Sequence, residues 1–237
     1  MAGTTRYGPL VHRAVHHAAI FLLAGVVIFL AGNALTQWAW DYFRNSSTPV
    51  YSLQFNYISD LGAIHCHEVA NRYVCSPWHF VFATATVLLG LCLIFGVLLM
   101  KSAFPPRRVR TIGLGILALS GVGAIGVGLF AEDYDLTVHT ASALLAFLGS
   151  NLALLVLSVA MLRDTRWDGY RLFTAACGLF GLVALILFVA HAWGPVGVGG
   201  MERLIVAPTL VWAAVVGVHL YRIPTFSAPK VEATGSP

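Results

Sequence analysis

The chain has 237 residues, of which 58% are hydrophobic and only 10% are charged, and its mean hydropathy is +0.80. Soluble domains usually carry about 25% charged residues, so this composition excludes a water-soluble fold. Stretches of about 20 apolar residues can cross a hydrocarbon core about 30 Å thick, and several follow one another here. The composition therefore predicts an all-α polytopic membrane protein.

Six apolar segments are long enough to span a membrane. Charged residues, glycines and prolines bound them, and they place the predicted helices at residues 18–38, 79–100, 111–131, 139–161, 172–193 and 204–221. Most connections are short, so we expect consecutive helices to pack as antiparallel neighbours in a single domain, residues 1–222. Residues 223–237 form a short polar tail, for which we expect disorder.

Lysine and arginine residues are distributed unevenly between the two sides of the predicted membrane. Eleven fall on one side, and only Arg44, Arg72 and Arg203 fall on the other. Because cytoplasmic loops carry the excess of basic residues, we predict that both termini are cytoplasmic and that the first helix acts as an uncleaved signal anchor. We expect a plasma-membrane protein, and topology explains the formal net charge of +4 better than nucleic-acid binding does.

The third predicted helix is unusually rich in glycine. Small residues let helix backbones approach closely in lipid, so we expect this helix at the centre of the bundle. Its glycines are Gly113, Gly115, Gly121, Gly123, Gly126 and Gly128.

Two of the four cysteines lie in the long first outer loop, predicted at residues 39–78, and the other two lie inside predicted helices. Only Cys66 and Cys75 face an oxidising compartment in this topology, which favours a disulfide that staples the loop. A zinc site is the competing interpretation, because metal-binding side chains are frequent in the same stretch. They are His65, Cys66, His67, Glu68, Cys75 and His79.

Ionisable residues gather at the outer ends of the predicted helices. Such groups are costly near hydrocarbon depth and usually point into the bundle or pair with one another, so their convergence makes a candidate site. Individually they also fit structural roles: an interfacial position for each histidine, a Glu202–Arg203 ion pair, and a helix cap from Asp133 or Asp135. The candidates are Asp60, His79, Asp133, His139, His191, Glu202 and Arg203.

Three motifs lie at these outer ends. They are Asn56-Tyr57-Ile58-Ser59-Asp60-Leu61-Gly62, Phe130-Ala131-Glu132-Asp133 followed by His139, and Gly200-Met201-Glu202-Arg203. Together they resemble an uncharacterised family of six-helix prokaryotic membrane proteins, over nearly the whole chain. The resemblance implies that the matched residues form a common feature of the outer face, and it brings no established activity.

A weaker similarity is to intramembrane zinc-dependent lipid hydrolases, the group of the alkaline ceramidases and progestin-receptor-like proteins. These use Ser, Asp and three His around zinc within a helical bundle. The similarity implies Ser59 and Asp60 as catalytic residues and His79, His139 and His191 as zinc ligands. The chain lacks the pair of histidines one helical turn apart that closes the site in that group.

The hypothesis that we favour is a membrane protein without assigned activity, whose outer cluster binds a lipid headgroup, a small ligand or a partner. Its binding residues are Asp60, Asp133, Glu202 and Arg203. The alternative is a zinc-dependent hydrolase of a lipid or lipid-linked substrate, and whether the chain is an enzyme stays open. A transporter is the third hypothesis, although no ionisable relay crosses the predicted midplane. We expect membrane lipids as partners, and zinc is the one cofactor considered.

Overall fold

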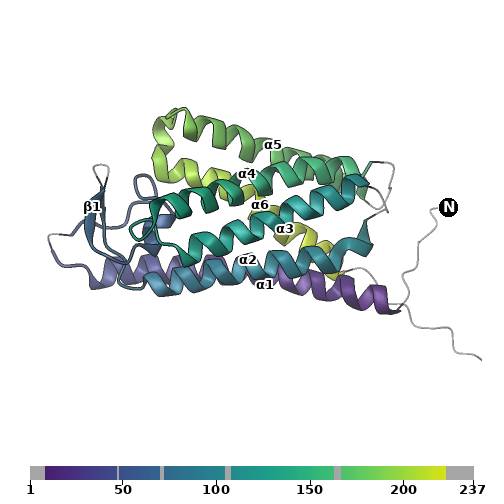
Figure 1. Cartoon of the computed structure of the whole chain (residues 1–237), viewed down its shortest axis with the longest axis horizontal. Helices are drawn as coiled ribbons and strands as arrows, with labels where there is room; N and C mark the ends of the chain where they lie inside the picture. The colour runs from purple at the N-terminus through teal and green to yellow at the C-terminus, as the bar shows by residue number, and fades with distance from the viewer. Residues whose placement is uncertain (1–8, 47, 70–71, 105–107, 163–166, 223–237) are drawn as a thin grey trace, which may run out of the picture.

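The computed structural model describes residues 9–46, 48–69, 72–104, 108–162 and 167–222, and this part of the chain forms an elongated helical bundle (Figure 1). Six of its helices are long and apolar enough to cross a membrane, which confirms the predicted fold class. They are α1 (Pro9–Phe43), α2 (His79–Met100), α3 (Arg108–Leu129), α4 (Leu136–Ala160), α5 (Asp168–Val189) and α6 (Gly197–Tyr221). The tail at residues 223–237 lies outside the described residues.

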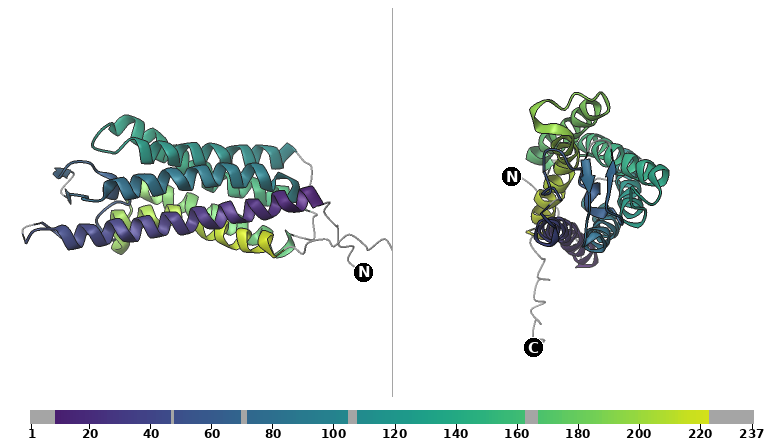
Figure 2. Two further views of the ribbon diagram at one scale, coloured as in Figure 1. Left: turned by 90° about the horizontal axis from the view of Figure 1, so that it is seen from below. Right: turned by 90° about the vertical axis from the view of Figure 1, so that its left-hand side faces the viewer.

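Helices that are consecutive in sequence pack side by side, and α6 closes the arrangement by packing against both α5 and α1. Figure 2 shows the bundle from below and from one end. Only 28% of the membrane-length window of α5 is buried, against 39 to 50% in the other helices, so α5 is the most peripheral. The remaining five helices surround the interior of the bundle.

Glycines mark the closest helix contacts, as their number in the third helix indicated. A Cβ added to Gly90 in α2 would lie 2.4 Å from the carbonyl oxygen of Gly121 in α3, and one added to Gly123 would lie 2.6 Å from the backbone nitrogen of Ala146 in α4. Only a residue without a side chain permits this approach. The prediction that this helix lies at the centre of the bundle was wrong, however, because α3 packs mainly against α2 and α4.

The helices α1 and α6 extend farthest beyond their predicted bounds. α1 has 35 residues, which at 1.5 Å each gives about 52 Å, well beyond the hydrocarbon thickness. α6 begins at Gly197, not at residue 204, because the glycines that resemble a loop in the sequence are helical. Their lack of side chains lets the first outer loop lie directly on the helix: a Cβ on Gly199 would be 2.0 Å from the carbonyl oxygen of Asn56.

The connection between α1 and α2 has structure of its own. It contains the short 3-10 helix η1 (Ser59–Gly62) and the strands β1 (His67–Val69) and β2 (Arg72–Val74), which pair antiparallel with His67 opposite Val74. A disulfide joins Cys66 to Cys75 and closes this hairpin, as the sequence predicted. Two further 3-10 turns, η2 (Lys101–Ala103) and η4 (Gly194–Val196), lie at the end of α2 and before α6.

Candidate functional site

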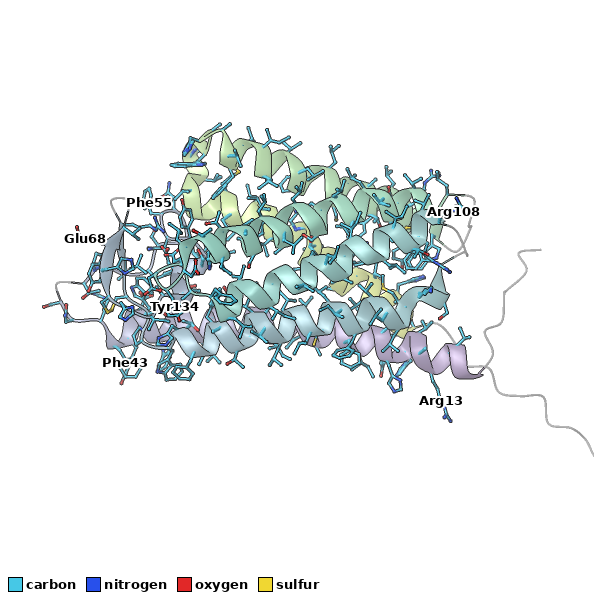
Figure 3. The ribbon with its side chains drawn as sticks, viewed as in Figure 1. Arg13, Phe43, Phe55, Glu68, Arg108 and Tyr134 are labelled. Atoms are coloured by element: carbon cyan, nitrogen blue, oxygen red, sulfur yellow. A yellow bond between two sulfur atoms is a disulfide. The ribbon has the colours of Figure 1, made fainter. Side chains whose placement is uncertain are left out.

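One end of the bundle holds the loop between α1 and α2, and we call it the outer end after the topology predicted from the sequence. Asp60 in η1 is the most deeply buried charged residue there, and polar side chains are concentrated around the labelled Phe55, Glu68 and Tyr134 (Figure 3). Its side chain has no exposed surface. The Arg72 guanidinium donates to both carboxylate oxygens, with Nε at 2.9 Å from Oδ2 and Nη2 at 2.9 Å from Oδ1. Although burial opposes the charge on Arg72, the Asp60 carboxylate raises the pKa of Arg72 above its ordinary value. This two-point geometry is the strongest that Arg forms with a carboxylate.

Two further groups hold the Asp60 carboxylate in place. Asn56 Nδ2 donates to Oδ2 at 2.9 Å, and the backbone N–H of Tyr57 donates to the same oxygen at 3.1 Å. The Tyr57 ring also lies under Arg72, with 4.1 Å between the ring centroid and the guanidinium carbon. The Asn56–Asp60 segment and the hairpin are therefore tied together through one side chain, Arg72.

Glu132, in the turn between α3 and α4, joins this group from the opposite side. Ser59 Oγ donates to Glu132 Oε2 at 3.1 Å, and Arg72 Nη2 lies 3.4 Å from Oε1. Burial, and then the neighbouring Asp60 carboxylate, raise the pKa of Glu132 to about 8. Glu132 therefore takes up a proton more readily than an ordinary glutamate does, and Arg72 balances the charge of Asp60. We call Ser59, Asp60, Arg72 and Glu132 the outer network.

Arg203 is not the partner of Asp60, and it forms no ion pair with Glu202 among the described residues. Its Nη1 donates to three carbonyl oxygens, those of Leu53, Asn56 and Gly199, and its Nη2 contacts the hydroxyl of Tyr51. Tyr51 in turn donates to the carbonyl of Tyr57 at 2.8 Å. Burial raises the pKa of Tyr51 above its usual range despite the nearby Arg203, so this phenol stays neutral. Arg203 thus fixes the first outer loop onto α6.

Glu202, in the second turn of α6, faces the interior of the bundle. Its Oε2 accepts a hydrogen bond from the backbone N–H of Ile58, and the residue is only 6% exposed. A cavity of about 80 Å³ extends from this carboxyl group into the bundle, between α1, α2, α3, α4 and α6. Its wall is mostly apolar, with Phe29, Phe82, Leu89, Ala143, Phe147 and Val206 among the lining residues.

Polar side chains line the cavity at its outer end and again farther along α6. Ser59, His139 and Glu202 line its outer end. Farther along α6, seven residues after Glu202, Thr209 also lines the cavity, and its buried Oγ1 has no hydrogen-bond partner among the described residues. Buried hydroxyl groups normally find a partner, so the space next to Thr209 suits a molecule with a polar atom.

The three histidines that resemble zinc ligands have separate surroundings. His139 Nδ1 lies 2.7 Å from the carbonyl oxygen of Phe130, and His79 Nδ1 lies 3.1 Å from that of Ser76. His191 is exposed at the end of α5, next to Trp193. Within the described ranges, no three His, Cys, Asp or Glu side chains are grouped to hold a metal ion. The zinc site and the roles of Ser59 and Asp60 in hydrolysis therefore stay predictions.

Asp133 and Asp135 organise the turn before α4. Asp133 accepts hydrogen bonds from the backbone N–H groups of Ile64 and His65. Burial works against its charge, but these bonds lower the pKa of Asp133 below its ordinary value. Asp135 accepts from the backbone N–H of Val138 and caps α4. Of the two caps considered from the sequence, Asp135 is the one in the structure, and Asp133 holds the outer loop instead.

The family described as "Protein of unknown function (DUF998)" matches residues 34–219 of this chain. The chain belongs to this family. The match begins within α1 and ends in α6, so the outer network and the Arg203 contacts lie inside it, as does the cavity lining except Phe29. No curated protein and no solved structure matches the chain. The resemblance to an uncharacterised membrane family is confirmed, and the protein is an integral membrane protein of that family.

Three residues of the site escaped sequence reasoning. Arg72 was used only in counting basic residues for the topology, although it is one of three basic residues on the predicted outer side, where most of the acidic residues lie. Glu132 was placed in a turn without a partner, and Tyr51 was not considered. A basic residue that stands alone among carboxylates is the signal that could have identified Arg72, because buried carboxylates need a counter-charge.

Proposed function

We propose that this protein binds a small amphipathic ligand at the outer end of the bundle, with the apolar part of the ligand in the cavity and its polar group next to Glu202. The observation that carries the proposal is the cavity itself. It has an apolar wall from five helices and a polar end made by Ser59, His139 and Glu202. Binding sites for small molecules combine these two features, because burial supplies affinity and a few polar groups supply orientation.

The polar end offers mainly hydrogen-bond acceptors. Because the Phe130 carbonyl can only accept, His139 Nδ1 is the donor of that hydrogen bond, and in a neutral imidazole Nε2 is then an acceptor. Ser59 Oγ donates to Glu132 and keeps its own lone pairs, and the Glu202 carboxyl group accepts from the Ile58 N–H. The matching ligand group is therefore a donor, a hydroxyl or an amine.

A photolabelling experiment tests this proposal. A diazirine-bearing pentanol would be irradiated with the full-length protein in lipid nanodiscs, and the labelled residues would be mapped by peptide mass spectrometry. We expect labelling at the cavity lining. A diazirine-bearing pentane of equal length should label the cavity several-fold less, because it lacks the hydroxyl that the acceptors bind.

Two matched variants control for unspecific partition into lipid. Ala143 lines the cavity, so Ala143→Leu should fill it and abolish labelling there. Ala141 lies on the same helix and is exposed, so Ala141→Leu should leave the labelling unchanged. Equal labelling of the wild type and Ala143→Leu would refute the proposal.

The topology is part of the same proposal. Eleven of the 14 basic residues belong to sequence segments that the predicted topology places on the side opposite the outer network, which supports an orientation in the plasma membrane with both termini in the cytoplasm. The cavity would then open toward the outer leaflet. Labelling of single introduced cysteines with a membrane-impermeant maleimide in intact cells tests this: Glu68→Cys should react and Arg108→Cys should not.

A further inference from the structure

A second candidate site lies at the opposite end of the molecule, independent of the cavity. There a groove of about 460 Å³ runs between the first turns of α1, the end of α2 with η2, and the start of α3. One part of its lining is apolar and belongs to membrane-spanning helices, and the other part is polar. The lining residues are Val11, Ala14, Leu98, Leu99, Lys101, Ser102 and Arg110.

Two positive charges stand at the polar part of this groove. Arg110 is held in position, because its Nη1 donates to the carbonyl oxygens of Lys101 at 3.3 Å and of Phe104 at 3.2 Å. Lys101 itself is exposed. Within the described residues neither cation has a carboxylate within 4.0 Å. As far as the described residues go, the groove therefore presents positive charge without a paired carboxylate, in a partly fixed geometry.

The position of the charges relative to the apolar wall defines the chemistry of the ligand. Leu98 and Leu99 lie in the last turn of α2, and Lys101 and Ser102 follow directly in η2, where hydrocarbon gives way to the headgroup layer. A ligand that satisfies both parts needs acyl chains along α1 and α2 and an anionic group at Lys101 and Arg110. Basic pockets between helices bind anionic phospholipid headgroups in this way.

We infer that this groove, which we call the basic groove, binds one anionic phospholipid, with the phosphate between Lys101 and Arg110. The Ser102 hydroxyl lies in the lining as a further donor to the phosphate. A zwitterionic lipid carries the same phosphate, but its own ammonium group cancels the charge. A soluble phosphate ion gains nothing from Val11, Ala14 and the two leucines.

Native mass spectrometry of the full-length protein tests the inference. The protein would be released from nanodiscs containing equal amounts of phosphatidylglycerol and phosphatidylcholine, and the retained lipids would be counted. We expect the wild type to retain phosphatidylglycerol preferentially. Lys101→Gln should reduce this preference about fivefold, since one basic residue near an anionic surface contributes about that factor.

Arg13→Gln is the matched control. Arg13 is exposed at the same end of the bundle and lies outside the groove lining, and Figure 3 shows it pointing away from the bundle. Neither Arg13 nor Lys101 donates a side-chain hydrogen bond to a described residue, so both variants should fold like the wild type. We expect Arg13→Gln to keep the lipid preference.

Three outcomes would overturn the inference. The first is equal retention of the two lipids by the wild type. The second is an equal loss of preference in Arg13→Gln and Lys101→Gln, which would mean that general surface charge attracts the lipid. The third is displacement of the bound lipid by millimolar inorganic phosphate, which would mean that the groove binds an anion without its chains.

Discussion

The pair of Asp60 and Arg72 gives the most specific prediction for stability. Replacing Arg72 with glutamine leaves the Asp60 carboxylate fully buried, and its remaining donors among the described residues include the Asn56 side chain and the Tyr57 N–H, but no cation. Removing one partner of a buried ion pair costs about 3 to 5 kcal/mol, because the remaining charge cannot reach water. We expect Arg72→Gln to lower the free energy of unfolding by about that amount.

Reversible unfolding by SDS in mixed micelles, followed by helical circular dichroism, would measure this effect. Arg44→Gln is the control, because exposed Arg44 donates one hydrogen bond of 3.3 Å to the Thr48 carbonyl, and its loss should change stability by less than about 0.5 kcal/mol. Adding Asp60→Asn to Arg72→Gln should recover at least about 1 kcal/mol, because the double variant has no unpaired carboxylate at residue 60. A loss below about 1 kcal/mol in Arg72→Gln, or strict additivity in the double variant, would refute the reasoning.

Three further predictions concern the same end of the molecule and its packing. The pKa of Glu132 is raised to about 8 in the folded state, whereas the unfolded state releases this proton near pH 4.5. The stabilisation from the bound proton is therefore complete below pH 4.5 and is lost as the pH rises toward 8. Glu132→Gln should flatten the dependence of stability on pH over that range, and an unchanged slope would contradict the assignment. Reducing the Cys66–Cys75 disulfide, or replacing Cys75 with serine, should lower the free energy of unfolding by about 2 to 3 kcal/mol, because the open loop has more conformational entropy in the unfolded state. The midpoint of SDS unfolding with and without reductant measures this effect, and equal midpoints would count against it. Gly199→Ala should destabilise the folded protein, because the added Cβ would meet the Asn56 carbonyl. Gly115→Ala adds a Cβ that meets nothing within 4 Å, so it should stabilise the helix by about 0.5 kcal/mol. Thermal unfolding that ranks the two variants in the opposite order would show that these contacts are not decisive.

Hydropathy was sufficient to predict the six helices, because a span needs only length and apolar composition. The predicted disulfide is also present. Asp60, His139 and Glu202 were predicted to lie at one end of the bundle, and in the structure Asp60 lies near Glu132 while Ser59, His139 and Glu202 line one cavity.

The sequence did not show which way a side chain points around its helix axis, or which partner a loop residue contacts. His79 and His139 were predicted at a similar depth, yet in the structure the Nδ1 atom of each contacts a nearby backbone carbonyl. Asp60 pairs with Arg72, which the sequence did not indicate, because the disulfide-closed hairpin brings residue 72 back over η1. Such contacts depend on the path of an irregular loop, which composition does not define.

The contact between the Ile58 N–H and Glu202 joins residues 144 positions apart. In synthesis from the N-terminus, the loop around Ile58 leaves the ribosome long before α6 exists. The Ile58 N–H and the carbonyl oxygens of Gln54 and Asn56 receive these partners only when α6 packs beside α1. A chain truncated after α5 would therefore lack the partners of these three backbone groups, although the outer network, which contains no residue of α6, could still form.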